Sequence, residues 1–220
     1  FGLLNEAFHA NYGWDLFYNV LKGIPTGDKG PQDIKNYVQR INQLYPKGSY
    51  PMNFITNQDT NSWEGTTSEM FGEAEKAIAA LSFTLPGMPM IYSGQEVGLD
   101  KRLQFFEKDE IDWTDSRNLR SFYTSLVQMK KQNPALYNGS EGGDVQFLDT
   151  SDPTILAFQR EKDGNRVISV FNLSSETVSG TVYMDAYYTS VLEESELILE
   201  SEQTFTLAPW EFHIFSNHQS

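Results

Sequence analysis

The feature that most constrains the fold is a change of pattern near Asn133 and Pro134. Before it, short apolar segments alternate with segments whose apolar residues recur every three to four positions. From about Gly139 onward, short segments alternate apolar and polar residues and are separated by turn signals such as "KDGNR". We therefore expect two units, an α/β unit over residues 1–134 and an antiparallel β-sandwich over residues 135–220.

The distribution of charge supports the same boundary. The net charge is −14, but residues 1–134 carry 13 basic and 16 acidic side chains whereas residues 135–220 carry 3 and 14. An acidic surface repels phosphate backbones, so we expect no nucleic-acid partner. No apolar run approaches the ~18 residues that a membrane helix needs, so we expect no membrane span. The chain has no cysteine, which excludes disulfides and thiolate metal sites but does not decide between a cytoplasmic and an exported bacterial protein.

Strands and helices can be placed along both units from periodicity and from turn signals. In the first unit we expect strands at residues 7–14, 53–56 and 87–92, and helices at 15–24, 31–46, 68–85 and 115–132, with Asp15 and Ser68 as N-caps. Apolar strands that alternate with helices are typical of a parallel sheet. In the second unit we expect strands at 145–148, 155–161, 166–173, 177–184, 190–195, 197–201 and within 205–215.

A polar cluster, Asn57, Gln58 and Asp59, directly follows the expected strand at residues 53–56. Functional side chains of parallel α/β folds lie at the C-terminal ends of strands, so this carboxylate is suited to bind sugar hydroxyls or to stabilise a cation. The alternative is an ordinary turn, because Asn and Asp favour turns. Trp63 lies among polar residues just after the cluster and is the best candidate for an exposed ring that stacks on a sugar.

A second cluster is the segment "PGMPMIYSGQEVG", residues 86–98, where Gly94 and Gly98 bound a loop after an apolar strand. Glu96 lies in this loop, and a role in tying the loop through an Arg or backbone amides is favoured over catalysis. Further aromatic residues lie near these loops, and for most of them core packing is the favoured interpretation: Tyr12, Trp14, Tyr92, Phe105, Phe106 and Trp113.

These two clusters, in this order and spacing, resemble glycoside hydrolase family 13, the α-amylase family. The family carries Asn-His-Asp after its seventh barrel strand, where this chain reads "FITNQD", and "GMPMIYSGQE" matches the family's segment at its eighth strand. "FHANYGWDL" looks like the sixth strand and the start of its helix. "KRLQFFEKDEIDW" and the terminal "LAPWEFHIF" also resemble family segments, so the resemblance extends over nearly the whole chain.

The resemblance implies a partial (β/α)8 TIM barrel, roughly strands 6 to 8, followed by a β-sandwich. It implies retaining hydrolysis of α-glucosidic bonds in starch or maltooligosaccharides, which requires two carboxyl groups that flank the scissile bond. It assigns to Asp59 the role of the third carboxylate, which hydrogen-bonds the distorted sugar. Substrate contacts are expected from Asn57, Gln58, Trp63 and Tyr12.

Two departures from the family pattern shape the expectation. The family's nucleophile and general acid lie on its fourth and fifth strands, and no Gly-x-Arg-x-Asp segment occurs here; Glu6 is not expected to be the acid. The isolated chain is therefore expected to be inactive, with the other barrel half in a longer polypeptide, a proteolytic partner or a second copy. Gln58 stands where the family has histidine, and a Gln can donate a hydrogen bond but cannot become cationic.

Two other functions remain open from the sequence. One is a catalytically inactive glucan-binding homologue, which the Gln58 substitution favours slightly. The other is a family 13 transglycosylase or isomerase, such as a trehalose synthase. We expect no metal in this chain, and the resemblance assigns any calcium to the full-length parent.

Overall fold

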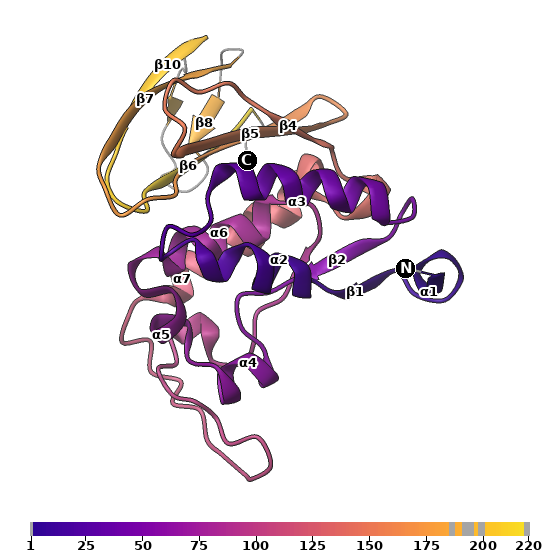
Figure 1. Ribbon diagram of the computed structural model, residues 1–220, viewed down its shortest axis with the longest axis vertical. Coiled ribbons are helices and arrows are strands. Elements are labelled where there is room, and N and C mark those ends of the chain that lie inside the picture. The colour runs from indigo at the N-terminus through magenta and orange to yellow at the C-terminus, as the bar shows by residue number, and fades with distance from the viewer. Residues whose placement is uncertain (1, 185–187, 191–195, 198–200, 218–220) are drawn as a thin grey trace.

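The computed structural model describes residues 2–184, 188–190, 196–197 and 201–217. Helices lie beside a short parallel sheet in the first part of the chain, and antiparallel strands gather at one end of the molecule (Figure 1). Among the described residues, no helix is long and apolar enough to cross a membrane.

The parallel sheet consists of β1 (Ala10–Tyr12), β2 (Tyr50–Asn53) and β3 (Met88–Pro89), in the order β1-β2-β3. Ala10 pairs with Tyr50 and Met52 pairs with Met88, both in parallel register. The strand expected at residues 53–56 is therefore misplaced, since β2 ends where that expectation begins. Phe54 and Ile55 are fully buried by packing rather than by strand pairing, which explains why their apolar run suggested a strand.

Seven α-helices lie within the described residues. They are α1 (Gly2–Glu6), α2 (Trp14–Asn19), α3 (Pro31–Leu44), α4 (Gln58–Trp63), α5 (Thr67–Phe71), α6 (Glu75–Thr84) and α7 (Leu119–Gln132). In α3, Pro31 occupies the first turn and Asp33 accepts a hydrogen bond from the N–H of Gly30 at 3.0 Å. The apolar spacing of α3 predicts one buried stripe, and Ile34, Val38 and Ile41 are buried, whereas Leu44 at the end of the stripe is exposed.

The N-cap predicted at Asp15 is wrong. Gly13 precedes the first residue of α2, and Asp15 lies within the first turn. Its carboxylate instead pairs with the guanidinium of Arg40 on α3, with 3.0 Å between Nη2 and Oδ2. The carboxylate thus joins two helices rather than ending one.

The single helix predicted over residues 68–85 is also wrong, as is its cap at Ser68. Thr66 is the cap, and its hydroxyl accepts a hydrogen bond from the N–H of Glu69 at 3.2 Å. The helix is broken at Gly72, whose φ of 53° lies in the left-handed region. The break separates α5 from α6, which is buried on nearly every side.

The second part of the chain forms two antiparallel sheets. Its strands are β4 (Val145–Phe147), β5 (Ile155–Lys162), β6 (Asn165–Asn172), β7 (Val178–Tyr183), β8 (Tyr188–Ser190), β9 (Glu196–Leu197), β10 (Glu202–Leu207) and β11 (Phe212–Ser216). One sheet has the order β4-β5-β6-β11-β8-β9 and the other pairs β10 with β7. The expected mixture of helices with antiparallel sheets is confirmed; residues 191–195 and 198–200 of the predicted strands lie outside the described residues.

The larger hydrophobic core is shared by both parts of the chain. It joins the buried stripe of α3 and the body of α6 to buried residues of β5 and β6, including Phe158 and Phe171. Arg160 on β5 reinforces this junction, because its guanidinium donates to the carbonyls of Thr84 at 3.2 Å and Leu85 at 3.4 Å, at the C-terminal end of α6. A smaller core cluster lies between the two antiparallel sheets.

Candidate functional site

The candidate site lies at the carboxyl ends of the three parallel strands. Beyond β1 the chain enters α2, beyond β2 it enters α4, and beyond β3 it enters the glycine-bounded loop that contains Glu96. Parallel strands place their carboxyl ends at one edge of a sheet, so the residues that follow them form a common rim. The sequence prediction that Asp59 follows a parallel strand end agrees with this arrangement, although the strand ends earlier than expected.

Asn57 is fully buried and caps the short helix α4. Its Oδ1 accepts hydrogen bonds from the backbone N–H groups of Asp59 at 2.9 Å and Thr60 at 2.8 Å. In return, the Thr60 hydroxyl accepts a hydrogen bond from the N–H of Asn57 at 2.9 Å. Asn57 Nδ2 is buried without a hydrogen-bond partner. The side chain therefore holds the backbone at Asp59, and a direct contact with substrate stays a prediction.

Asp59 is partly exposed, and its charge acts on two tyrosines from the neighbouring strand ends. Hydrogen bonding to Glu64 is the main cause that raises the pKa of Tyr18 to about 12, with burial and the negative charges of Glu64 and Asp59 as further causes. Burial raises the pKa of Tyr92, and the charge of Asp59 raises it further. Asp59 thus acts on residues that follow β1 and β3, the two strands that flank β2 in the sheet.

Tyr18 belongs to a small network with Glu64 and Lys22. The Tyr18 hydroxyl donates a hydrogen bond to Glu64, and the Lys22 ammonium forms an ion pair with the same carboxylate. Burial acts to raise the pKa of Glu64, but the hydrogen bonds from Lys22 and Tyr18 outweigh it and hold the pKa below its usual value. Glu64 is therefore held as a carboxylate that orients the Tyr18 ring.

Stacked rings line the side of the rim beyond β1. Tyr12 stacks on Trp14 at a centroid distance of 5.7 Å, and Trp14 stacks on Tyr18 at 5.6 Å. Phe54, which is buried beneath them, meets the edge of Trp14 at 4.9 Å. Tyr12 and Tyr18 remain exposed, so the row presents aromatic surface beside Asp59.

The residues predicted for the site occupy two elements. Gln58, Asp59 and Trp63 all belong to α4, where Gln58 is exposed and Trp63 is 62% exposed. Asp59 and Trp63 are four residues apart on this helix and therefore share a face. Tyr12 comes from β1 and reaches the rim through its stack with Trp14. Their contacts with substrate remain predictions.

Glu96 has a local structural contact, as expected. Its carboxylate accepts a hydrogen bond from the N–H of Gly94 at 3.0 Å. Gly94 has a φ of 90°, and a Cβ there would lie 2.9 Å from the Leu99 side chain, so the loop requires glycine at this position. Gln95 adds a hydrogen bond to the Tyr123 hydroxyl at 2.9 Å and fastens the loop to α7.

Sequence reasoning did not single out Tyr18, Lys22 or Glu64. A signal was present, because Trp14, Tyr18 and Lys22 recur every four residues and so fall on one side of the segment that follows β1. Their partner Glu64 is far away in the sequence, and no local pattern connects it with them. Among the described residues, no group of three or more His, Cys, Asp or Glu side chains is placed to hold a metal ion.

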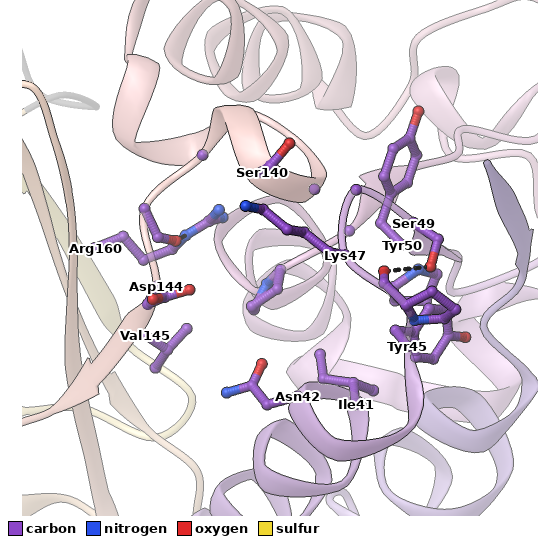
Figure 2. Close-up of a pocket in the computed structure, with 18 of the residues that line it drawn as sticks. Ile41, Asn42, Tyr45, Lys47, Ser49, Tyr50, Ser140, Asp144, Val145 and Arg160 are labelled. Carbon is purple, nitrogen blue, oxygen red and sulfur yellow. Dashed lines mark hydrogen bonds between the residues drawn. The ribbon is translucent and has the colours of Figure 1, made fainter. Parts of the chain in front are cut away.

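A separate hollow of about 600 Å³ lies at the other end of the parallel strands. Figure 2 shows Lys47, Asp144 and Arg160 among the side chains that line it. Tyr50 and Pro51, at the start of β2, also belong to its wall. The hollow therefore lies at the amino ends of the strands, away from Asp59.

Comparisons with known proteins link both parts of the chain to amylases. The family model for the maltogenic amylase C-terminal domain matches residues 145–214. A maltogenic α-amylase of Bacillus acidopullulyticus is 24% identical over 96% of this chain and 37% of its own length. A β/α-amylase of Paenibacillus polymyxa is 28% identical over 90% of this chain and 17% of its own length. The chain thus spans well under half of these curated relatives.

Solved structures of amylases share the fold. A maltogenic α-amylase from Thermotoga neapolitana matches with a TM-score of 0.79 at 18% identity, over 97% of this chain and 52% of its own. An α-amylase from Lactobacillus plantarum matches with a TM-score of 0.75 at 18% identity, over 97% of this chain and 49% of its own. Taken with the family model, these matches support a similarity between this chain and the C-terminal region of the α-amylase family, glycoside hydrolase family 13.

Proposed function

We propose that the chain is the second half of a (β/α)8 catalytic barrel, residues 1–134, followed by a β-sandwich, residues 135–220. The protein that contains it is a retaining glycoside hydrolase that acts on α-glucosidic bonds of starch or maltooligosaccharides. The parallel order β1-β2-β3 and the helices between these strands support the barrel assignment. AmyP, a protein of similar fold, has been solved in complex with maltose, and a variant of it in complex with maltotriose, which supports the substrate class.

The observation that carries the proposal is the position of Asp59 at the carboxyl ends of the strands, between residues that follow β1 and β3. There its carboxylate can accept hydrogen bonds from the hydroxyls of a bound sugar, and these bonds strengthen as the ring flattens toward the transition state. Glu64 and Glu96 already have protein partners in the same loops. Asp59 is therefore assigned to transition-state stabilisation, with Gln58, Asn57, Trp63 and Tyr12 as substrate-binding residues.

The decisive experiment is Asp59→Asn in the protein that contains this chain. The change keeps the size of the side chain but removes its charge, so kcat on starch should fall at least ~100-fold, the loss typical for a preorganised electrostatic group. Far-UV circular dichroism and the melting temperature should remain those of the parent. Near-normal turnover in a folded Asp59→Asn protein contradicts the assignment. The isolated 220-residue chain should release no reducing sugar from starch.

A glucan-binding homologue without activity is a second candidate, favoured by Gln58 at the family's histidine position. Gln58→His separates the two candidates. In an enzyme weakened by this substitution, the change should raise kcat; in a binding protein, the variant should bind maltooligosaccharides and still release no sugar. Chromatography of the products distinguishes hydrolysis from the third candidate, transglycosylation or isomerisation.

We propose that this chain binds no calcium. Any calcium in the full-length protein is then bound by residues outside this chain. Calcium titration of the isolated chain followed by calorimetry should show no binding heat, and a stoichiometric signal contradicts the proposal.

A further inference from the structure

Three exposed aromatic rings meet beside α4. Trp63 from α4 lies 5.6 Å from Phe105 and 6.4 Å from Phe106 between ring centroids, and the two phenylalanine rings are 4.8 Å apart. Their exposed fractions are 62% for Trp63, 42% for Phe105 and 81% for Phe106. We call these three residues the aromatic platform. The long loop between β3 and α7 extends below α4 in Figure 1.

The loop that carries the phenylalanines is held at its base. Asn61 of α4 accepts a hydrogen bond from the N–H of Leu103 at 2.8 Å and donates to the carbonyl of Lys101 at 3.2 Å. The Ser62 hydroxyl donates to the Leu103 carbonyl at 2.7 Å. Three hydrogen bonds from α4 thus fix the loop segment that precedes Phe105.

The far side of the same loop is closed by Asp109. Its carboxylate accepts hydrogen bonds from the N–H groups of Gln104 at 3.0 Å and Glu110 at 2.8 Å, and it pairs with Lys101. The hydrogen bond from Lys101 is the main cause that lowers the pKa of Asp109 to about 2, and the two backbone bonds add to it. Phe105 and Phe106 are therefore presented by a preorganised turn, which reduces the entropy cost of binding.

The charges around the platform favour a neutral ligand. Lys101 is paired with Asp109, and Arg102 is paired with Glu69 at 2.8 Å. These cations are already engaged with carboxylates of the protein, so they offer little to an anionic surface or to a phosphate backbone. A ligand with apolar faces and uncharged hydroxyls needs no such partner.

We propose that the aromatic platform binds the sugar units of an α-glucan beyond those that contact Asp59, so that it selects long glucan chains over short ones. The inference rests on the proposed function, because Trp63 lies one helical turn from Asp59 on the same face of α4. An α-glucan that is bound at Asp59 and continues along that face of α4 reaches the aromatic platform. A short oligosaccharide ends before it reaches Phe105 and Phe106.

The test compares maltoheptaose with maltotriose by isothermal titration calorimetry on the 220-residue chain. A Phe105→Ala/Phe106→Ala double variant should weaken maltoheptaose binding about tenfold, from the lost apolar contact, and leave maltotriose binding unchanged. Tyr183→Ala is the matched control, since Tyr183 is 45% exposed but lies on β7 of the distant β-sheet. Circular dichroism should confirm that each variant is folded.

Several results overturn the inference. These are equal affinity of the parent chain for both sugars, an unchanged maltoheptaose affinity in the double variant, and no binding of either sugar. Light scattering tests whether a second copy of this chain covers the aromatic platform instead. If the parent chain is a dimer and the double variant is a monomer, the platform serves self-association and the inference fails. The proposed function fails separately, through normal turnover in the Asp59→Asn enzyme, whatever the platform binds.

Discussion

Asn57 and Thr60 cap each other at the start of α4, where each side chain accepts a hydrogen bond from the other's backbone N–H. Loss of an N-cap side chain costs roughly 1–2 kcal/mol, and here the cap also holds the backbone of Asp59. We expect Asn57→Ala to lower the free energy of unfolding by about that amount in urea titrations.

Asn57→Ser is the matched variant, because serine is also a good N-cap. It should recover most of the stability lost in Asn57→Ala. Equal destabilisation by serine and alanine contradicts a capping role and points to the buried amide itself.

A second prediction concerns the ion pair between Glu75 and Arg117. The Glu75 side chain is 3% exposed, pairs with Arg117 and accepts a further hydrogen bond from the Thr67 hydroxyl at 2.5 Å. Arg117→Met leaves the buried carboxylate without its cation, so we expect a loss of about 3 kcal/mol in the free energy of unfolding. Adding Glu75→Gln to that variant should restore part of the loss, because the unpaired charge is removed.

Arg102→Met provides the control for this pair. Arg102 binds Glu69, whose side chain is 48% exposed, so water screens the pair and its removal should cost far less than the loss of Arg117. If Arg117→Met and Arg102→Met lose similar amounts of unfolding free energy, burial of the Glu75 carboxylate does not determine the strength of its ion pair.

The helices with strong local signals could be predicted from the sequence, whereas the short elements of the site could not. In α3, Pro31 at the start and a stripe of apolar residues give the helix nearly its observed length. α4 has only six residues, so no periodicity reveals it, and the sequence predicts Asn57 as part of a polar cluster at a strand end rather than as a helix cap. The bounds of β2 could not be predicted either. β2 ends at Asn53, and the buried residues Phe54 and Ile55 after it resemble strand residues although they form no strand.

The position of Asp59 at a strand end could be predicted, but its electrostatic surroundings could not. The prediction needed only a short apolar run followed by polar residues. The hydrogen bond between Tyr18 and Glu64 joins residues 46 positions apart, so no local pattern in the sequence connects them.

A third prediction follows from the raised pKa of Tyr18. Because the folded state holds this proton more tightly than the unfolded state, the contribution to stability is fully present below pH 10. It is then lost as the pH rises from the ordinary value of 10 to about 12. The difference between the ultraviolet titration curves of the parent and of Tyr18→Phe should therefore show a tyrosine that ionises near pH 12.

Glu64→Gln tests the cause of that shift. The substitution removes the negative charge and weakens the acceptor of the Tyr18 hydrogen bond, so the Tyr18 pKa should move toward 10. A Tyr18 that still ionises near pH 12 in this variant attributes the shift to burial and Asp59 instead.

A fourth prediction concerns Arg160, which is buried at the junction between β5 and α6. Its guanidinium donates to four backbone carbonyls, those of Thr84, Leu85, Tyr137 and Gly143. A lysine ammonium cannot span this arrangement, so Arg160→Lys should leave carbonyls unpaired and lower the free energy of unfolding by about 3 kcal/mol.

Arg166→Lys is the matched control on the neighbouring strand, where the arginine pairs with a largely exposed Glu161 at 2.7 Å. It should change stability by less than about 1 kcal/mol. Calorimetry of Arg160→Lys also reports whether the chain then melts in two steps, as expected if Arg160 couples the helical part to the β-sheets. A single unshifted transition contradicts the coupling.

The shared hydrophobic core has a consequence for how such proteins can evolve. Phe158 and Phe171 of the β-sheets pack in the same cluster as the buried stripe of α3 and the body of α6. A recombination event that exchanged residues 135–220 alone would set foreign side chains against this surface. Exchange between relatives should therefore succeed when α3 and α6 are inherited together with the sheets, so the unit of inheritance is larger than the sandwich.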